Sequence, residues 1–185
     1  MELVRKVHGG QEQRTPDWLQ RPGAAEAGRR WGLIRAVYAE LTGMELPEVM
    51  PPRERRTVDC VLQRRGEPPR MVEFDETQHF NRYRAITLRR YPRTMRVAFD
   101  RGAWLRACDA KSAMEGGGFA RPKPPLFPQE DGRHRQRAYR DALADLLPAV
   151  HGWLPTLRIA DLEVKPWIYD RGARARIADL LANRL

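Results

Sequence analysis

The chain of 185 residues contains only two cysteines, Cys60 and Cys108, and they lie far apart in the sequence. It therefore lacks the clustered cysteines that small disulfide-held domains and zinc sites require. No apolar run approaches the roughly 20 residues of a membrane-spanning helix, and no signal-peptide core is present in the first residues, MELVRKVHGGQEQR. These absences favour a cytoplasmic protein with no membrane contact, held together by an ordinary hydrophobic core.

Acidic residues are the minority among the charged side chains. The chain has 24 Asp and Glu against 34 Lys and Arg, which gives a formal charge of +10. A basic chain favours a polyanionic partner, and nucleic acid is the commonest one. The excess is mainly arginine, which a coding sequence rich in G and C would also produce, so the charge alone does not decide the function.

The length is that of one domain, and hydrophobic periodicity predicts an α/β fold. The clearest element is a helix over residues 24–42, where apolar side chains recur at steps of three and four and Gly43 follows as a C-cap. The further predicted elements are strands 57–62 and 71–75, a helix 81–90, a strand 95–99, helices 104–114 and 133–147, a strand 156–164 and a helix 171–184.

We expect these elements to form three parts, which are an N-terminal arm, a core and a C-terminal extension. Residues 1–23 are polar and predict a loosely structured arm, which Trp18 and Leu19 could pin to the body. Residues 24–115 form the expected core, and residues 116–185 a basic, mainly helical extension packed on it.

Three acidic residues gather on the hairpin predicted over residues 57–75. Side chains alternate along a strand, so Glu73 and Asp75 share one face while the apolar residues between them turn to the presumed core. If the hairpin is centred on Gly66, Asp59 lies directly opposite Glu73. Opposed carboxylates are destabilising, and a divalent cation such as Mg²⁺ or Mn²⁺, which prefers oxygen ligands, would compensate them.

A structural interpretation of the same acids competes with the metal site. Charged side chains often occupy the solvent face of an edge hairpin, where they block aggregation. The arginines that would balance the acids are Arg55, Arg56, Arg64 and Arg65. The order of the predicted elements around the acids, which is helix, hairpin, helix and strand, favours a functional site instead.

This order and these acids resemble the PD-(D/E)XK nuclease superfamily, whose core is a helix, a three-stranded meander, a helix and a further strand. The family has an Asp on the second strand and a (D/E)-x-K on the third. Asp59 and Glu73 match the two acids, whereas Asp75 stands where the Lys is usual. The run Val-Glu-Phe-Asp-Glu-Thr-Gln-His over residues 72–79 is similar to the E-x-D and His form of very-short-patch-repair endonucleases and their relatives.

The resemblance covers roughly residues 24 to 100 and implies a restriction-endonuclease-like α/β core with a C-terminal helical extension. It also implies an enzyme, a metal-dependent endonuclease that uses Mg²⁺ or Mn²⁺ to hydrolyse nucleic acid, with DNA as the expected substrate. Asp59, Glu73 and Asp75 would bind the metal and take part in catalysis. Glu40, on the helix 24–42, resembles an extra helical acid of the family, although it could equally be a surface residue.

Gln78 and His79 follow the second strand closely enough to orient the attacking water, and His79 could shuttle a proton near neutral pH. The alternative is that His79 caps the next helix or packs at its start. Arginines that could grip phosphates lie on the helices 81–90 and 133–147; they are Arg82, Arg84, Arg89, Arg90, Arg133, Arg135 and Arg137. A solvated helix surface explains either basic run equally well.

Two other functions stay open at this point. Loss of the usual Lys would permit a nuclease-fold module that binds nucleic acid without cutting it. An interaction subunit whose basic surface meets an acidic protein would show no salt-sensitive binding to DNA.

Overall fold

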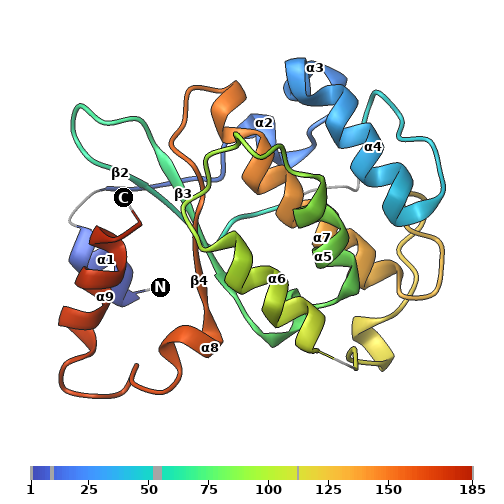
Figure 1. Cartoon of the computed structure of the whole chain (residues 1–185). Coiled ribbons are helices and arrows are strands. Elements are labelled where there is room, and N and C mark those ends of the chain that lie inside the picture. The colour runs from blue at the N-terminus through green and yellow to red at the C-terminus, as the bar shows by residue number, and fades with distance from the viewer. Residues whose placement is uncertain (1, 9–10, 52–55, 112, 185) are drawn as a thin grey trace.

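The computed structural model describes residues 2–8, 11–51, 56–111 and 113–184. It has a mixed α/β fold, in which a four-stranded sheet lies between two groups of helices (Figure 1). The strands, in their order across the sheet, are β1 (Gln11–Gln13), β2 (Cys60–Gln63), β3 (Arg70–Asp75) and β4 (Leu157–Ala160). Strand β2 is antiparallel to both β1 and β3, and β4 runs parallel to β3.

Helices account for most of the remaining chain. The α-helices are α1 (Glu2–His8), α2 (Asp17–Gln20), α3 (Ala24–Ala27), α4 (Trp31–Thr42), α5 (Arg82–Arg90), α6 (Arg101–Ala110), α7 (Gly132–Leu146), α8 (Asp161–Val164) and α9 (Ala173–Ala182). The 3-10 turns are η1 (Gly28–Arg30), η2 (Thr77–His79), η3 (Gly117–Phe119) and η4 (Pro148–Val150). Within the described ranges, no helix is both long enough and apolar enough to cross a bilayer.

The predicted register of the β2–β3 hairpin is confirmed. Cys60 pairs with Val72 and Val61 with Met71, which is the pairing of a hairpin centred on Gly66. The first strand begins at Cys60, so Asp59 directly precedes it. Its carboxylate nevertheless accepts a hydrogen bond of 2.7 Å from the backbone N–H of Phe74, which keeps Asp59 beside β3.

The hairpin does not lie at the edge of the sheet. Strand β1 pairs with β2, and β4 pairs with β3, so both strands of the hairpin are interior. The interpretation of the acids as charges on an edge hairpin is therefore wrong. The described residues before position 23 are more ordered than expected, because β1 supplies backbone hydrogen bonds to β2. Leu19 is fully buried, as expected of a residue that pins this segment to the body.

The parallel neighbour of β3 comes from a later part of the chain than predicted. Residues 95–99 do not form a strand; they contribute one isolated bridge, from Ala98 to Leu157. Strand β4 lies beside β3 instead. Its residue Leu157 pairs with Val72 of β3 on one side and forms the bridge to Ala98 on the other. Strand β1, which precedes residue 23, and strand β4, which follows residue 115, thus belong to the same sheet as the two strands of the predicted core.

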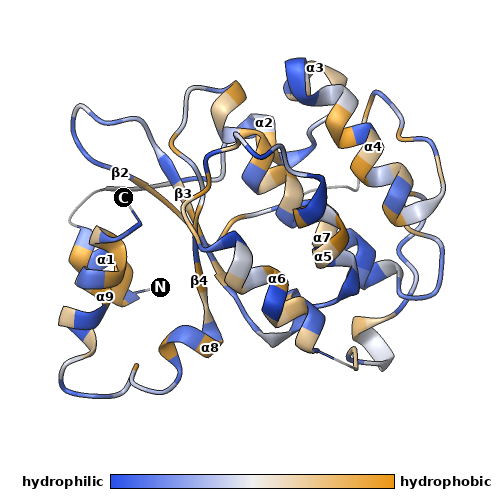
Figure 2. Cartoon of the chain, in the orientation of Figure 1, coloured by the Kyte–Doolittle hydropathy of each residue, from blue (hydrophilic) through white to orange (hydrophobic). Residues whose placement is uncertain are grey.

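Both faces of the sheet are buried. Val61 and Met71 face the larger core, which α4, α5, α6 and α7 complete. Cys60, Leu62 and Val72 face a smaller core closed by α1 and α9, and Figure 2 shows that β2 and β4 are largely apolar. The acids of β3 therefore lie beneath helices of the larger core, where the sequence predicted an exposed face.

A buried ion network joins β4 to α5 and α7. Arg158 has no exposed surface and donates to Asp75 at 2.6 Å and to Asp145 at 2.7 Å. Asp145 also binds the Arg84 guanidinium at 2.7 Å and accepts a hydrogen bond of 2.7 Å from the hydroxyl of Tyr91. Buried charges are tolerated only when they are paired in this way, so the network fixes how the helices pack on the sheet.

We expect Asp145→Ala to lower the free energy of unfolding by about 3–5 kcal/mol, because it leaves two buried guanidinium groups without their shared partner. Urea denaturation measures this change. Asp109→Ala is the matched control, since the Asp109–Arg89 pair is more than half exposed and its loss should change stability by less than about 1 kcal/mol. Equal effects of the two substitutions would contradict the role assigned to the buried network.

Candidate functional site

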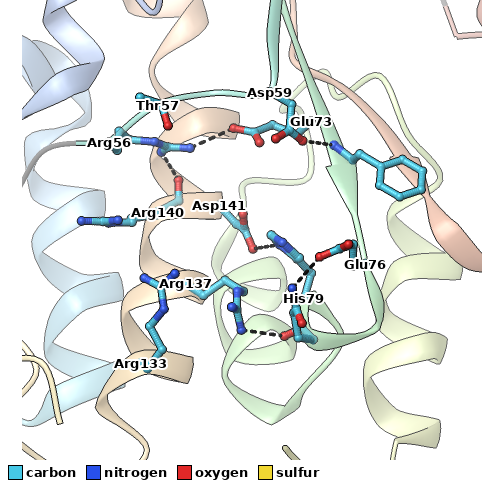
Figure 3. A pocket seen from close by; sticks show the side chains of 12 residues that line it. Arg56, Thr57, Asp59, Glu73, Glu76, His79, Arg133, Arg137, Arg140 and Asp141 are labelled. Atoms are coloured by element: carbon cyan, nitrogen blue, oxygen red, sulfur yellow. Dashed lines mark hydrogen bonds and ion pairs between the residues drawn. The ribbon is translucent and has the colours of Figure 1, made fainter. Parts of the chain in front are cut away.

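A cavity of about 520 Å³ lies between the end of β3 and the helix α7 (Figure 3). Its strand side is mainly acidic, and its helix side is mainly basic. The residues that line it are Arg56, Thr57, Asp59, Glu73, Phe74, Glu76, Gln78, His79, Arg133, Arg137, Arg140 and Asp141. Four of the residues that the sequence predicted for catalysis, Asp59, Glu73, Gln78 and His79, meet here.

Asp59 and Glu73 lie on the same wall of the cavity. The paired register ends at Cys60 and Val72, which directly adjoin this pair in the sequence, and Figure 3 shows the two side chains next to each other. Glu73 is 7 % exposed and forms an ion pair of 3.0 Å with Arg56, whose guanidinium also donates to the backbone carbonyl of Arg140. Arg55, which the sequence suggested as a further balancing charge, lies outside the described residues.

The electrostatics around Glu73 leave its charge incompletely compensated. Burial raises the pKa of Glu73 to about 7, and the negative charges of Asp59 and Asp141 act in the same direction. Arg56 and Arg158 lower this pKa without offsetting the other causes. The carboxyl therefore exchanges its proton near neutral pH, and an additional cation beside it would favour the ionised form.

His79 is held by Asp141 of α7. Its Nδ1 lies 3.0 Å from Asp141 Oδ2 and 3.5 Å from Asp75 Oδ1. Burial lowers the pKa of His79, but the two carboxylates outweigh it and the net shift is upward. Burial likewise opposes the charge of Asp141, yet His79 and Arg158 hold the pKa of Asp141 well below its ordinary value.

The N-cap of α5 is Asn81 and not His79. The Asn81 side chain accepts hydrogen bonds from the backbone N–H groups of Tyr83 and Arg84, at 3.0 and 3.1 Å. The capping role considered for His79 is therefore wrong. Because Nδ1 of His79 faces Asp141, Nε2 is the ring atom that can exchange a proton with a molecule in the cavity.

Asp75 lies beneath the cavity and does not line it. Its side chain is fully buried, with one oxygen bound by Arg158 at 2.6 Å and the other by the indole N–H of Trp104 at 2.7 Å. Burial raises its pKa, and the positive charge of Arg158 opposes that shift. Asp75, His79 and Asp141 place potential ligand atoms within 4.8 Å of one another, but the Arg158 guanidinium already supplies a positive charge to both carboxylates.

Of the arginines predicted to contact phosphates, those on α7 are divided between the cavity and another surface. Arg133 and Arg137 line the cavity, together with Arg140. Arg135 turns away, because it donates to the Leu41 carbonyl and stacks on Tyr83, with its guanidinium carbon 4.4 Å from the ring centroid.

The four arginines of α5 do not line the cavity, and each is paired with an acid elsewhere. Arg84 is buried with Asp145, so no phosphate can reach its guanidinium. The other pairs are Arg82 with Asp131, Arg89 with Asp109 and Arg90 with Glu40. The last pair also accounts for Glu40, which lies outside the cavity lining.

Sequence reasoning missed two charged residues that hold the site in place, Asp141 in the cavity lining and Arg158 outside it. A signal for Asp141 was present, since Arg137, Asp141 and Asp145 follow at four-residue spacing and share one face of α7. Arg158 is a charged residue within an apolar strand, which is a pattern that favours a buried partner.

The raised pKa of Glu73 predicts how stability depends on pH. Between its ordinary value of 4.5 and about 7, the folded chain keeps a proton that the unfolded chain releases, so the free energy of unfolding falls as pH rises through this window. The total loss is on the order of 3 kcal/mol. Urea denaturation in EDTA should therefore show a shallower decline for Glu73→Gln than for the wild type. Parallel curves for the two proteins between pH 4.5 and 7 would contradict the assignment.

Residues 36–123 match a family of unknown function, DUF7255. This range contains Asp59, Glu73 and His79, but not α7, which supplies Asp141 and the arginines of the opposite wall. Neither the curated proteins nor the solved structures contain a match to this chain.

Proposed function

We propose that this protein is a metal-dependent endonuclease that hydrolyses phosphodiester bonds of nucleic acid, with DNA as the expected substrate, on a restriction-endonuclease-like core. One observation carries the proposal. Asp59 and Glu73 lie together on one wall of a cavity whose opposite wall presents Arg133, Arg137 and Arg140. A polyanion that enters between the walls would meet its counter-charges on one side and a cation held by the carboxylates on the other.

The donor set fits Mg²⁺ or Mn²⁺. Asp59 and Glu73 offer hard carboxylate oxygens on one wall of the cavity. Burial, with the negative charges of Asp59 and Asp141, raises the pKa of Glu73 to about 7 despite the ion pair with Arg56, so a bound cation would favour its ionised form. When bound, such an ion would polarise a phosphoryl oxygen and lower the pKa of a water molecule.

The protein groups around the carboxylates have separate tasks in this proposal. The arginines of α7 hold the phosphates that flank the scissile bond through charge-assisted hydrogen bonds. His79, oriented by Asp141 through Nδ1, exchanges a proton at Nε2 with the attacking water or the leaving oxygen. Gln78 lines the same cavity, and its amide donates to Glu76 at 2.6 Å, so it can orient a polar ligand there.

Arg56 offers a replacement for the Lys that the resemblance leads one to expect. Asp75 stands at the position of that Lys and is buried beneath the cavity. The Arg56 guanidinium, 3.0 Å from Glu73, brings a positive charge to the carboxylate wall from a different part of the chain. In our proposal Arg56 stabilises the negative charge that develops on the phosphoryl group.

The ion pair between Arg56 and Glu73 favours a second candidate, a module that binds nucleic acid without cutting it. A guanidinium that stays on Glu73 would compete with a metal ion for that carboxylate. The basic wall formed by α7 would still bind phosphates in such a protein. The two candidates therefore differ in cleavage and agree in binding.

Cleavage of supercoiled plasmid in Mg²⁺ or Mn²⁺ distinguishes the candidates. We expect Asp59→Asn and Glu73→Gln each to reduce the rate by about 100-fold or more, because each removes a metal ligand. Glu45→Gln is the matched control, since Glu45 pairs with Arg35 at the surface and should not affect the rate. If wild-type protein retards the plasmid but cleaves it no faster than Asp59→Asn does in either metal, the nuclease proposal fails and the binding module remains.

The basic wall has its own test in the salt dependence of binding. We expect Arg133→Gln to weaken binding to duplex DNA and to lower the slope of log Kd against log salt concentration by about 1, as for one lost phosphate contact. Fluorescence anisotropy with a catalytically inactive background, Asp59→Asn, measures this slope. Arg174→Gln removes the same charge from α9 on the other side of the sheet and should leave the slope unchanged. An unchanged slope for Arg133→Gln would argue against α7 as the phosphate-binding wall.

A further inference from the structure

A second cavity, of about 300 Å³, lies near the turn of the β2–β3 hairpin. Arg70 of β3 contributes to its wall and, because side chains alternate along a strand, faces the opposite side of the sheet from Glu73. The cavity is therefore separate from the acidic one described above. Its charged and titratable lining residues are His8, Arg64, Glu67 and Arg70.

Arg70 is a buried guanidinium without a compensating charge in contact. It is 5 % exposed, and within the described part of the chain its Nη1 has no hydrogen-bond partner and no carboxylate lies within ion-pair distance. Burial lowers the pKa of Arg70, and Arg96 lowers it further, while Glu67 acts in the opposite direction. A buried cation in this position is costly unless an anion pairs with it.

The surroundings of Arg70 add to the positive charge of the cavity. Arg64 donates from Nε to the backbone carbonyl of His8 at 2.9 Å, which orients its guanidinium at the cavity wall. The pKa of His8 is lowered mainly by burial and further by the positive charges of Arg64 and Arg70. Both arginines therefore lie close enough to His8 to influence its protonation. Glu67, which is exposed, supplies one negative charge against two arginines.

We propose that this cavity binds a phosphate group. Arg70 offers a buried donor, and the terminal nitrogens of Arg64 can complete the contact from the adjacent wall, since planar guanidinium groups match the oxygens of phosphate. The phosphate can be free inorganic phosphate or the terminal phosphate of a nucleotide or strand end. The site uses no residue of the acidic cavity and does not depend on nuclease activity.

Thermal unfolding of the full chain in EDTA, with sodium phosphate or sodium chloride at equal ionic strength, tests the site. Wild-type protein should show a saturable rise in Tm with phosphate that chloride does not produce. Arg70→Met should abolish this rise, and it should be at least as stable as wild type without phosphate, because it removes an unpaired buried charge. Arg64→Gln should raise the phosphate Kd, measured by calorimetry, by about tenfold or more.

Arg65→Gln is the matched control, because Arg65 is an exposed residue of the same turn that does not line the cavity. It should keep the wild-type response. If Arg70→Met does not fold, the calorimetric comparison of Arg64→Gln with Arg65→Gln decides the question. The proposal is overturned if the responses of Arg64→Gln and Arg70→Met match that of wild type. It is also overturned if neither inorganic phosphate nor a 5′-phosphorylated dinucleotide acts on wild type more than chloride does.

A dinucleotide with and without a 5′-phosphate identifies the source of the phosphate. Tighter binding of the phosphorylated form than of inorganic phosphate, lost in Arg70→Met, assigns the site to a nucleotide-borne group. Binding of inorganic phosphate alone assigns it to the free ion. Both results support a phosphate site, whereas binding of the dinucleotide irrespective of its phosphate, with no inorganic phosphate bound, overturns it.

Discussion

The buried guanidinium of Arg158 is the interaction on which the remaining structure depends. It reaches Asp75 of β3 and Asp145 of α7 directly, and its second terminal nitrogen donates to the backbone carbonyl of Asp141 at 3.0 Å. A charge with no exposed surface must be paired where it lies, so β4, β3 and α7 can assemble in few other ways. The ion pairs of Arg158 thus fix the position of the two walls of the acidic cavity relative to each other.

Arg158 also influences the protonation of the titratable residues in the cavity. The positive charge of Arg158 helps to keep Asp141 ionised, and ionised Asp141 holds His79 through Nδ1. Burial raises the pKa of Glu73 to about 7, because Arg56 and Arg158 lower it too little to offset the lost hydration. Two carboxylates of one site therefore differ in protonation because one is closely surrounded by cationic groups and the other is mainly desolvated.

Much of the arginine in this chain serves the fold. Arg84 and Arg158 are buried in ion pairs, while Arg82, Arg89 and Arg90 each bind an acid of another element. The basic runs of the sequence therefore do not translate into continuous basic surfaces. Positive charge does line the acidic cavity on its α7 wall opposite Glu73, and it lines the second cavity at the turn of the hairpin beside Arg70.

The sequence by itself determined the local structure: the hairpin register about Gly66, the C-cap at Gly43, the helix that begins after Asn81, and the meeting of Asp59 with Glu73. Each depends on turn geometry, capping or alternation over a few residues, which the sequence displays directly. Only the tertiary structure decided that β4 lies beside β3, that Asp75 is buried and that Asp141 holds His79. These contacts join residues far apart in the chain, such as Asp75 and Arg158 at a separation of 83 positions. A local pattern cannot specify which distant charge will compensate a buried one, because that depends on how the hydrophobic faces pack.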